Sequence, residues 1–196
     1  MTTPTLFLSL TLAAALIAGT AAAQTPDPIG PLTRVATFDR AQKINVGRTQ
    51  AGKTVCYFRE EGSSHSLDIG VTADGAYMRL DTFDEREATP AAPLRIFAGK
   101  EITRRQGNDE FSTGEFTVLK VYNGAFDYAP AMQRDSFTAI AKGDPKAFLD
   151  MVAAAKDHFV VVQSTSNPKV VNYTAIYQFK PAAIGPLLAC AKERVK

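Results

Sequence analysis

The chain contains 196 residues, of which 22 are Lys or Arg and 20 are Asp or Glu, so its formal net charge is +2. These charges are dispersed along the sequence. The chain therefore lacks both the basic stripe of nucleic-acid-binding proteins and the cationic amphipathic helix of proteins that bind anionic membranes. We expect no nucleic-acid partner.

The first 23 residues have the pattern of an export signal. An apolar run over residues 6–18 is followed by three alanines at 21–23, which are the small residues that a signal peptidase accepts. The run is too short for a membrane span, and no later stretch approaches the roughly 20 apolar residues that a span requires. We expect a cleaved signal peptide over residues 1–23, a periplasmic or secreted protein, and no membrane span after signal removal.

The mature chain is expected to form one domain. Residues 24–31 contain three prolines and no helical or strand periodicity, which is typical of a flexible or extended leader. Residues 32–196 are numerous enough for a single globular domain with its own hydrophobic core.

The clearest local prediction is a β-hairpin at Asp74-Gly75. Asp-Gly between two alternating strands favours a type I′ turn, because both central residues of that turn have positive φ. A two-residue loop there would place Val71 opposite Met78 and Ile69 opposite Leu80, with all four side chains on one face. The strand over residues 53–60 is apolar on both faces, which predicts a central position in the sheet. Further strands are expected at residues 94–97, 101–104 and 115–122.

The hydrophobic period changes in the last third of the chain. Residues 134–142 are compatible with a short helix ending at Gly143, and Asp144-Pro145 favours the start of another helix. Two strands, at 158–163 and 170–179, are expected before a final amphipathic helix near residues 184–191. The predicted fold class is α+β: a mostly antiparallel sheet, as a sandwich or partly closed barrel, with two or three helices in the C-terminal third.

The chain has two cysteines, Cys56 and Cys190. In an exported protein, two cysteines without a CxxC spacing indicate one structural disulfide rather than a redox pair or a metal site. The bridge would connect an early strand to the C-terminal helix.

Three residues are candidates for catalysis: His65, Asp68 and His158. His65 and Asp68 are close in sequence, but catalytic triads normally join distant segments, so His65 is expected to be a solvated loop residue. His158 is expected at a junction between a helix and a strand. The predicted hairpin would also place Asp68 opposite Asp81 and diagonal to Arg79, which we interpret as an exposed charge cluster.

Aromatic residues are the candidates for binding. Five tyrosines could build a binding face if the outer side of the sheet is exposed, although the expected alternative is that most belong to the core. These are Tyr57, Tyr122, Tyr128, Tyr173 and Tyr177. The sequence has no phosphate loop, dinucleotide fingerprint or zinc motif, so we expect no cofactor and no metal.

The last segment resembles the ending of small exported bacterial proteins such as the invasion-associated locus B group. The resemblance rests on a strand ending in Tyr177-x-Phe179 and a helix ending in residues 187–190. It covers only these common residue types and implies no function for the chain.

Two function classes follow, with a third kept open. The first is a small non-enzymatic exported protein that binds an envelope or extracellular protein or polymer through its sheet face or loops. The second is a small periplasmic enzyme of the hydrolase type, using His65 or His158 with a carboxylate. The third is a structural envelope protein that self-associates through an exposed apolar face.

Overall fold

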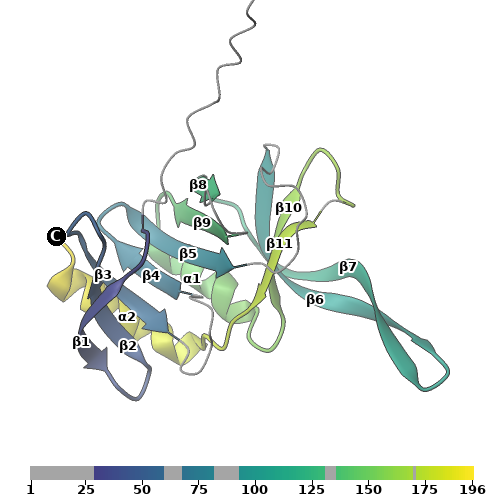
Figure 1. Cartoon of the computed structure of the whole chain (residues 1–196), viewed down its shortest axis with the longest axis horizontal. Helices are drawn as coiled ribbons and strands as arrows, with labels where there is room; N and C mark the ends of the chain where they lie inside the picture. The colour runs from purple at the N-terminus through teal and green to yellow at the C-terminus, as the bar shows by residue number, and fades with distance from the viewer. Residues whose placement is uncertain (1–28, 60–67, 82–92, 131–135, 170) are drawn as a thin grey trace, which may run out of the picture.

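The computed structural model describes residues 29–59, 68–81, 93–130, 136–169 and 171–196 (Figure 1). These residues form two open antiparallel sheets and two helices, and both helices lie in the C-terminal third. The expected α+β class is confirmed. The barrel alternative is not observed, because neither sheet closes on itself.

The larger sheet contains seven strands, and the smaller contains four. The order in the first is β1 (Thr33–Asp39), β2 (Ile44–Arg48), β3 (Thr54–Arg59), β4 (Asp68–Thr72), β5 (Gly75–Asp81), β9 (Ser136–Ala141) and β8 (Phe126–Pro130). The order in the second is β11 (Val171–Ile176), β10 (Phe159–Ser164), β6 (Leu94–Gln106) and β7 (Asp109–Tyr122).

The helices cover the inner faces of the sheets. Helix α2 (Pro181–Arg194) packs across β2, β3 and β4, while α1 (Pro145–Ala154) contacts α2, β5 and the two strands β6 and β7. Asp144 is the N-cap of α1, and its carboxylate accepts a hydrogen bond from the Lys146 backbone N–H at 2.9 Å. The start of α1 therefore agrees with the prediction.

β3 is a central strand, as predicted. Val55 and Tyr57 point to one side of the sheet and Cys56 and Phe58 to the other, and all four are buried. The outer side is covered by Ile29, which is buried and packs with Val55 and Tyr57.

The register of the predicted hairpin is wrong by two residues. Ile69 lies opposite Met78 and Val71 opposite Ala76, so the loop residues are Ala73 and Asp74. The Thr72 hydroxyl accepts a hydrogen bond from the Asp74 N–H at 3.0 Å. Gly75, with φ 140°, is the first residue of β5. A threonine turn therefore replaces the expected type I′ turn, and the shift of two preserves which side chains face the core.

Two further predictions need correction. Ser136–Ala141 is strand β9 and not a helix, because it pairs with both β5 and β8 and buries side chains on alternate faces. Tertiary pairing here overrides a weak helical pattern. The strands expected at 94–97 and 101–104 are one continuous strand, β6, which runs through Gly99.

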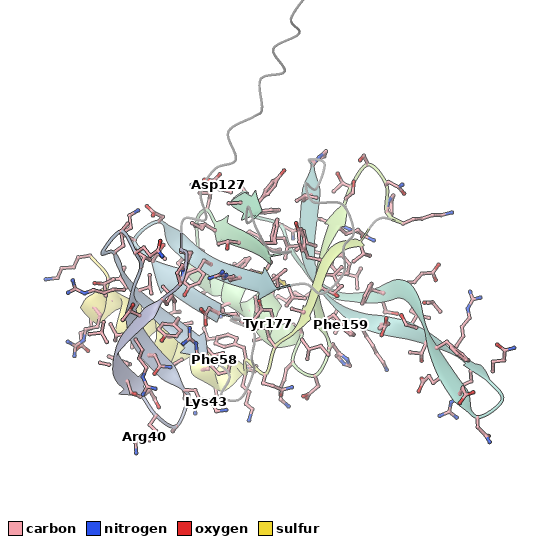
Figure 2. All side chains as sticks on the ribbon, in the orientation of Figure 1. Arg40, Lys43, Phe58, Asp127, Phe159 and Tyr177 are labelled. Atoms are coloured by element: carbon pink, nitrogen blue, oxygen red, sulfur yellow. A yellow bond between two sulfur atoms is a disulfide. The ribbon has the colours of Figure 1, made fainter. Side chains whose placement is uncertain are left out.

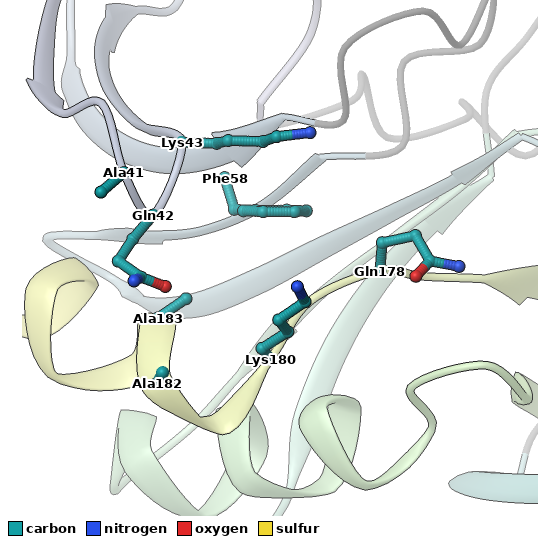
Figure 3. A pocket seen from close by; sticks show the side chains of 8 residues that line it. All are labelled: Ala41, Gln42, Lys43, Phe58, Gln178, Lys180, Ala182 and Ala183. Carbon is teal, nitrogen blue, oxygen red and sulfur yellow. The ribbon is translucent and has the colours of Figure 1, made fainter.

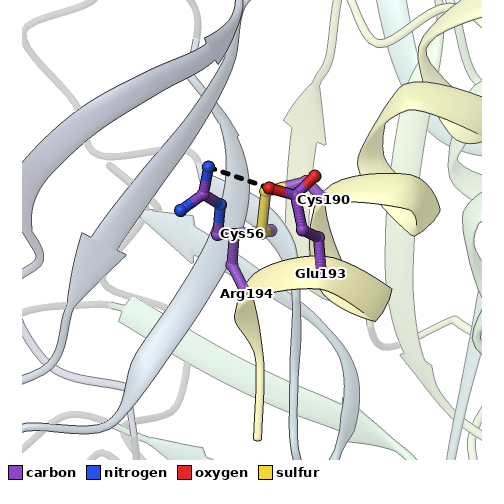
Figure 4. The surroundings of a disulfide bond; sticks show 4 residues. All are labelled: Cys56, Cys190, Glu193 and Arg194. Atoms are coloured by element: carbon purple, nitrogen blue, oxygen red, sulfur yellow. Dashed lines mark ion pairs between the residues drawn. A yellow bond between two sulfur atoms is a disulfide. The ribbon is translucent and has the colours of Figure 1, made fainter.

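The predicted disulfide is confirmed. Cys56 in β3 and Cys190 in α2 are bonded, their Cα atoms are 6.0 Å apart, and both side chains are fully buried (Figure 4). On the exposed surface of the same helix, Glu193 and Arg194 form an ion pair at 2.8 Å. A buried disulfide of this kind is typical of proteins that fold in an oxidising compartment.

Within the described residues, neither α1 nor α2 combines the length and the apolar composition needed to cross a membrane.

Candidate functional site

The candidate catalytic residues are not brought together in the described part of the chain. His65 lies outside the described residues. His158 follows Asp157, whose φ is 64°, at the end of the turn after α1. The carboxylate of Asp157 pairs with Lys156 at 2.9 Å, and its pKa is lowered mainly by that hydrogen bond. The carboxylate next to His158 is therefore already bound by a lysine.

Asp68 is buried, which differs from the expected exposed charge cluster. It is 1% exposed and accepts two hydrogen bonds from the Arg59 guanidinium, both at 3.3 Å. Because Ile69 is opposite Met78, the register places Asp68 beside Arg79 and not beside Asp81. The Asp68 carboxylate thus links β4 to β3 through Arg59, and both of its oxygens are engaged by the guanidinium and not available as a pair for a cation.

The five candidate tyrosines do not form one exposed face. Four of them, Tyr57, Tyr122, Tyr173 and Tyr177, are buried, and Tyr128 is partly buried against the core. The hydroxyls of Tyr122 and Tyr177 donate hydrogen bonds to backbone oxygens, at 2.9 Å to Lys142 and 2.6 Å to Arg79. These rings fill the interior and connect separate strands.

Tyr57 and Tyr77 lie on the outer side of the larger sheet. The Tyr77 ring covers Gly70 and the Tyr57 ring covers Gly47, since a Cβ at either glycine would overlap the ring. Burial raises the pKa of Tyr57 and raises that of Tyr77 well above its usual value, with the Asp68 carboxylate adding to the effect at Tyr77. Both phenols are therefore neutral at physiological pH and are poor general bases.

The most exposed feature of the described structure is a two-stranded projection that the sequence analysis did not identify. β10 pairs with β6 only as far as Gly99. Beyond that point, β6 and β7 continue as a ribbon with no third strand among the described residues, from Lys100 opposite Thr117 to Gln106 opposite Asp109 (Figure 1). We call residues 100–117 the arm. None of its residues is buried.

Polar cross-strand contacts hold the arm together. The Thr113 hydroxyl donates a hydrogen bond to the Ile102 carbonyl oxygen at 2.6 Å, and Arg105 lies directly opposite Glu110. The loop at its tip begins with Gly107, whose φ of 66° fits the first position of a type II′ turn. Phe116, near the base, packs edge-to-face on Phe159 of β10 with ring centroids 5.6 Å apart, and Phe159 lies where the ribbon leaves the sheet (Figure 2).

Apolar side chains along the ribbon are exposed to solvent. Phe111 is 51% exposed and Ile102 39%, and at the base of the arm Val118 and Leu119 are 42% and 45% exposed. β7 is also the last strand of its sheet, so its outer backbone groups have no strand partner within the described structure. An uncovered edge with apolar side chains is a surface suited to pairing with another polypeptide strand.

The sequence contains a signal for the arm. β6 and β7 have 13 and 14 residues, whereas strands of about 5–6 residues are usual. Both segments combine β-forming residues with charges of both signs on either side of the polar turn at residues 106–109. That pattern favours one long hairpin centred on this turn.

Comparisons of the chain with protein-family models, with curated proteins and with solved structures find no match. Among the described residues, no group of three or more His, Cys, Asp or Glu side chains is arranged to hold a metal ion.

Proposed function

We propose that this protein is an exported, non-enzymatic binding protein that holds a polypeptide of the envelope or the extracellular space along its arm. The partner would add an extended strand to the open edge of β7 and cover its apolar side chains. The protein would act in the periplasm or after secretion.

The observation that carries this proposal is the exposure of Phe111, Val118 and Leu119 along an unpaired edge strand. A two-stranded ribbon that packs on nothing is only marginally stable in water, and exposed aliphatic and aromatic side chains add no stability to it. A partner strand would supply backbone hydrogen bonds and would remove these side chains from water.

The charge of the arm favours a polypeptide over a charged polymer. It carries three basic side chains, Lys100, Arg104 and Arg105, and four acidic ones at positions 101, 109, 110 and 115. The arm therefore carries both signs of charge and these nearly cancel, so no field of one sign is available to attract a polyanion.

Site-specific photo-crosslinking in the native host tests the proposal. A benzophenone side chain replaces Phe111 in the arm, Leu119 at the base of the arm, or Val35 as the matched control, and positions 111 and 119 are the two arm positions of this experiment. Val35 is 58% exposed and lies on β1, the edge strand of the other sheet. We expect one discrete adduct with a different envelope or extracellular protein from the arm positions and none from position 35.

Four results would overturn the proposal. They are equal labelling from all three positions, no adduct from either arm position, an adduct with a polysaccharide or nucleic acid, and an adduct with the mass of two copies of this chain. The last result would instead support self-association.

Edge blocking provides an independent check. Val118→Lys places a charge at the base of the arm and should abolish the adduct from position 111, because a charged side chain blunts strand pairing. Val35→Lys should leave it unchanged. A double variant, His65→Ala with His158→Ala, should also leave the adduct unchanged, whereas its loss would favour the histidine-dependent hydrolase.

A further inference from the structure

A cavity of about 480 Å³ is lined by residues of β3, α2 and the β1–β2 turn (Figure 3), and Lys43 and Phe58 lie at the opposite end of the described structure from the arm (Figure 2). Its walls come from the turn between β1 and β2 (residues 41–43), from Phe58 of β3, and from the segment that leads into α2 (residues 178–183). A volume of this size accommodates a small organic molecule.

Two lysines from separate walls face this cavity without a carboxylate partner. Lys43 comes from the turn and Lys180 from the start of α2, and neither forms an ion pair with any described residue. No lining residue is acidic. Two ammonium groups beside one concave surface that no acidic side chain lines favour an anion there.

The start of α2 adds to this preference for an anion. Lys180 occupies the N-cap position but makes no side-chain capping hydrogen bond, and the first turn contains no acidic residue. A cation at the positive end of a helix is unfavourable, and Ser, Thr, Asp or Asn is the usual N-cap. α1 of the same protein follows the usual rule with Asp144. In α2 the unusual N-cap residue, Lys180, lines the cavity together with Ala182 and Ala183 of the first turn.

The wall that carries Lys43 is fixed by hydrogen bonds. The Asp39 carboxylate accepts a hydrogen bond from the Gln42 backbone N–H at 2.9 Å, and the Asn45 side chain donates one to the Lys43 carbonyl oxygen at 3.1 Å. Phe58 is nearly buried and packs edge-to-face on Phe179, with ring centroids 5.4 Å apart. The cavity therefore has a rigid aromatic surface and a fixed turn.

A second cavity, of about 340 Å³, shows the ordinary arrangement of charges. It is lined by Lys120 and Lys142, but also by Asp144 and Asp150. Lys120 lies 3.9 Å from Asp150, and Lys142 pairs with Asp127. Its lysines are paired with carboxylates, whereas Lys43 and Lys180 at the first cavity have no ion-pair partner in the described structure.

We propose that the cavity between the β1–β2 turn and α2 binds a small organic oxyanion. Its carboxylate or phosphate group lies between the ammonium groups of Lys43 and Lys180 at the start of α2, and its apolar part rests on Phe58 and the flanking alanines. This site is separate from the arm, and the proposal does not depend on the function proposed for the arm.

Amide chemical-shift titration of the mature protein tests the site with three probes: inorganic phosphate, benzoate and benzamide. Benzoate and benzamide have nearly the same shape, but only benzoate is charged. We expect benzoate to shift the amides of residues 42, 178, 182 and 183, and benzamide to leave them unchanged. If phosphate shifts the same amides, the site accepts any oxyanion. If only benzoate does, the site also requires the apolar part of the ligand.

The charge requirement is tested with Lys43→Gln combined with Lys180→Gln, and Lys169→Gln is the matched control on an exposed loop. The double variant should weaken benzoate binding about five- to tenfold, as expected for two solvent-accessible charge contacts, and Lys169→Gln should not change it. A thermal unfolding curve for each variant establishes that it is folded. The proposal is overturned if neither anion shifts these amides, if benzamide binds as well as benzoate, or if the folded double variant keeps full affinity.

Discussion

The arm and the rest of the described structure, which we call the body and which contains the disulfide, differ in the burial of their aromatic side chains. Phe137 in β9 is fully buried between the rings of Tyr128 and Tyr173, with centroid distances of 5.5 and 4.9 Å. Phe111 in the arm is 51% exposed and has no ring partner in the described structure. The body therefore gains stability from its aromatic residues, whereas the arm presents them to solvent. This difference makes the body the scaffold and the arm the candidate for binding.

Removal of the disulfide should have the largest effect on the body. Replacing Cys56 and Cys190 together by alanine should lower the free energy of unfolding by about 4–5 kcal/mol, because the bridge closes a very long loop in the unfolded chain. Urea unfolding measures the loss. Neither cysteine lies in the arm, so photo-crosslinking from position 111 in the folded double variant should persist. A loss below about 1 kcal/mol would contradict this account of the body.

The two phenylalanines give a direct comparison of the regions. Phe137→Ala should destabilise the protein by about 3–5 kcal/mol, since it leaves a cavity among packed rings. Phe111→Ala should change stability by less than about 0.5 kcal/mol, since the side chain is already half in water. Similar losses in the two variants, measured by urea unfolding, would show that the arm is packed in solution.

Glycine substitutions should separate the regions in the same way. Gly70→Ala should cost about 2–3 kcal/mol, because the new Cβ would overlap the Cys56 carbonyl oxygen and the Tyr77 ring. Gly107→Ala, at the tip of the arm, meets open space and should cost only about 1–2 kcal/mol from its positive φ. Thermal unfolding of the two variants measures both effects, and a Gly70→Ala variant as stable as the parent would show that the sheet relaxes around Tyr77.

Tyr77 should produce the smallest effect, which is visible only in alkali. Burial raises the pKa of the folded Tyr77 phenol, so the unfolded chain loses this proton first as the pH rises. The contribution of Tyr77 is fully present below the unfolded pKa near 10 and is lost progressively above it, with a slope of at most about 1.4 kcal/mol per pH unit. Tyr77→Phe should therefore reduce the fall in stability above pH 10 and change stability little at pH 7. Equal slopes for the two proteins would contradict the assignment.

Local patterns in the sequence were sufficient for several elements of the body. The two-sided apolar pattern of residues 53–60 predicted a central strand, and Asp144-Pro145 predicted the start of α1. Two cysteines in a chain with an export-like start predicted the disulfide. Each of these inferences depends on a short-range preference or on a simple count, and no competing long-range interaction opposes it.

Long-range pairing decided the rest. Residues 136–141 form a strand because β5 and β8 lie on either side of them, and no local pattern specifies those neighbours. Asp68 is buried because of the hairpin register and the position of Arg59, and a shift of two residues would have placed it beside Asp81. The candidate tyrosines are interior because other segments cover both sides of the larger sheet.

The sequence by itself determined the fold class, the strand-rich first part, the start of α1 and the cysteine pair, since these follow from periodicity, capping and composition. Only the tertiary structure decided where β10 stops pairing with β6, and thus that residues 100–117 project as an arm. Likewise, it brought Lys43 and Lys180, which are 137 positions apart in the printed sequence (180 − 43), to one cavity. Both features lie at the ends and edges of sheets. The position of a sheet edge depends on which distant strands pair, and the side-chain pattern within one strand does not encode that pairing.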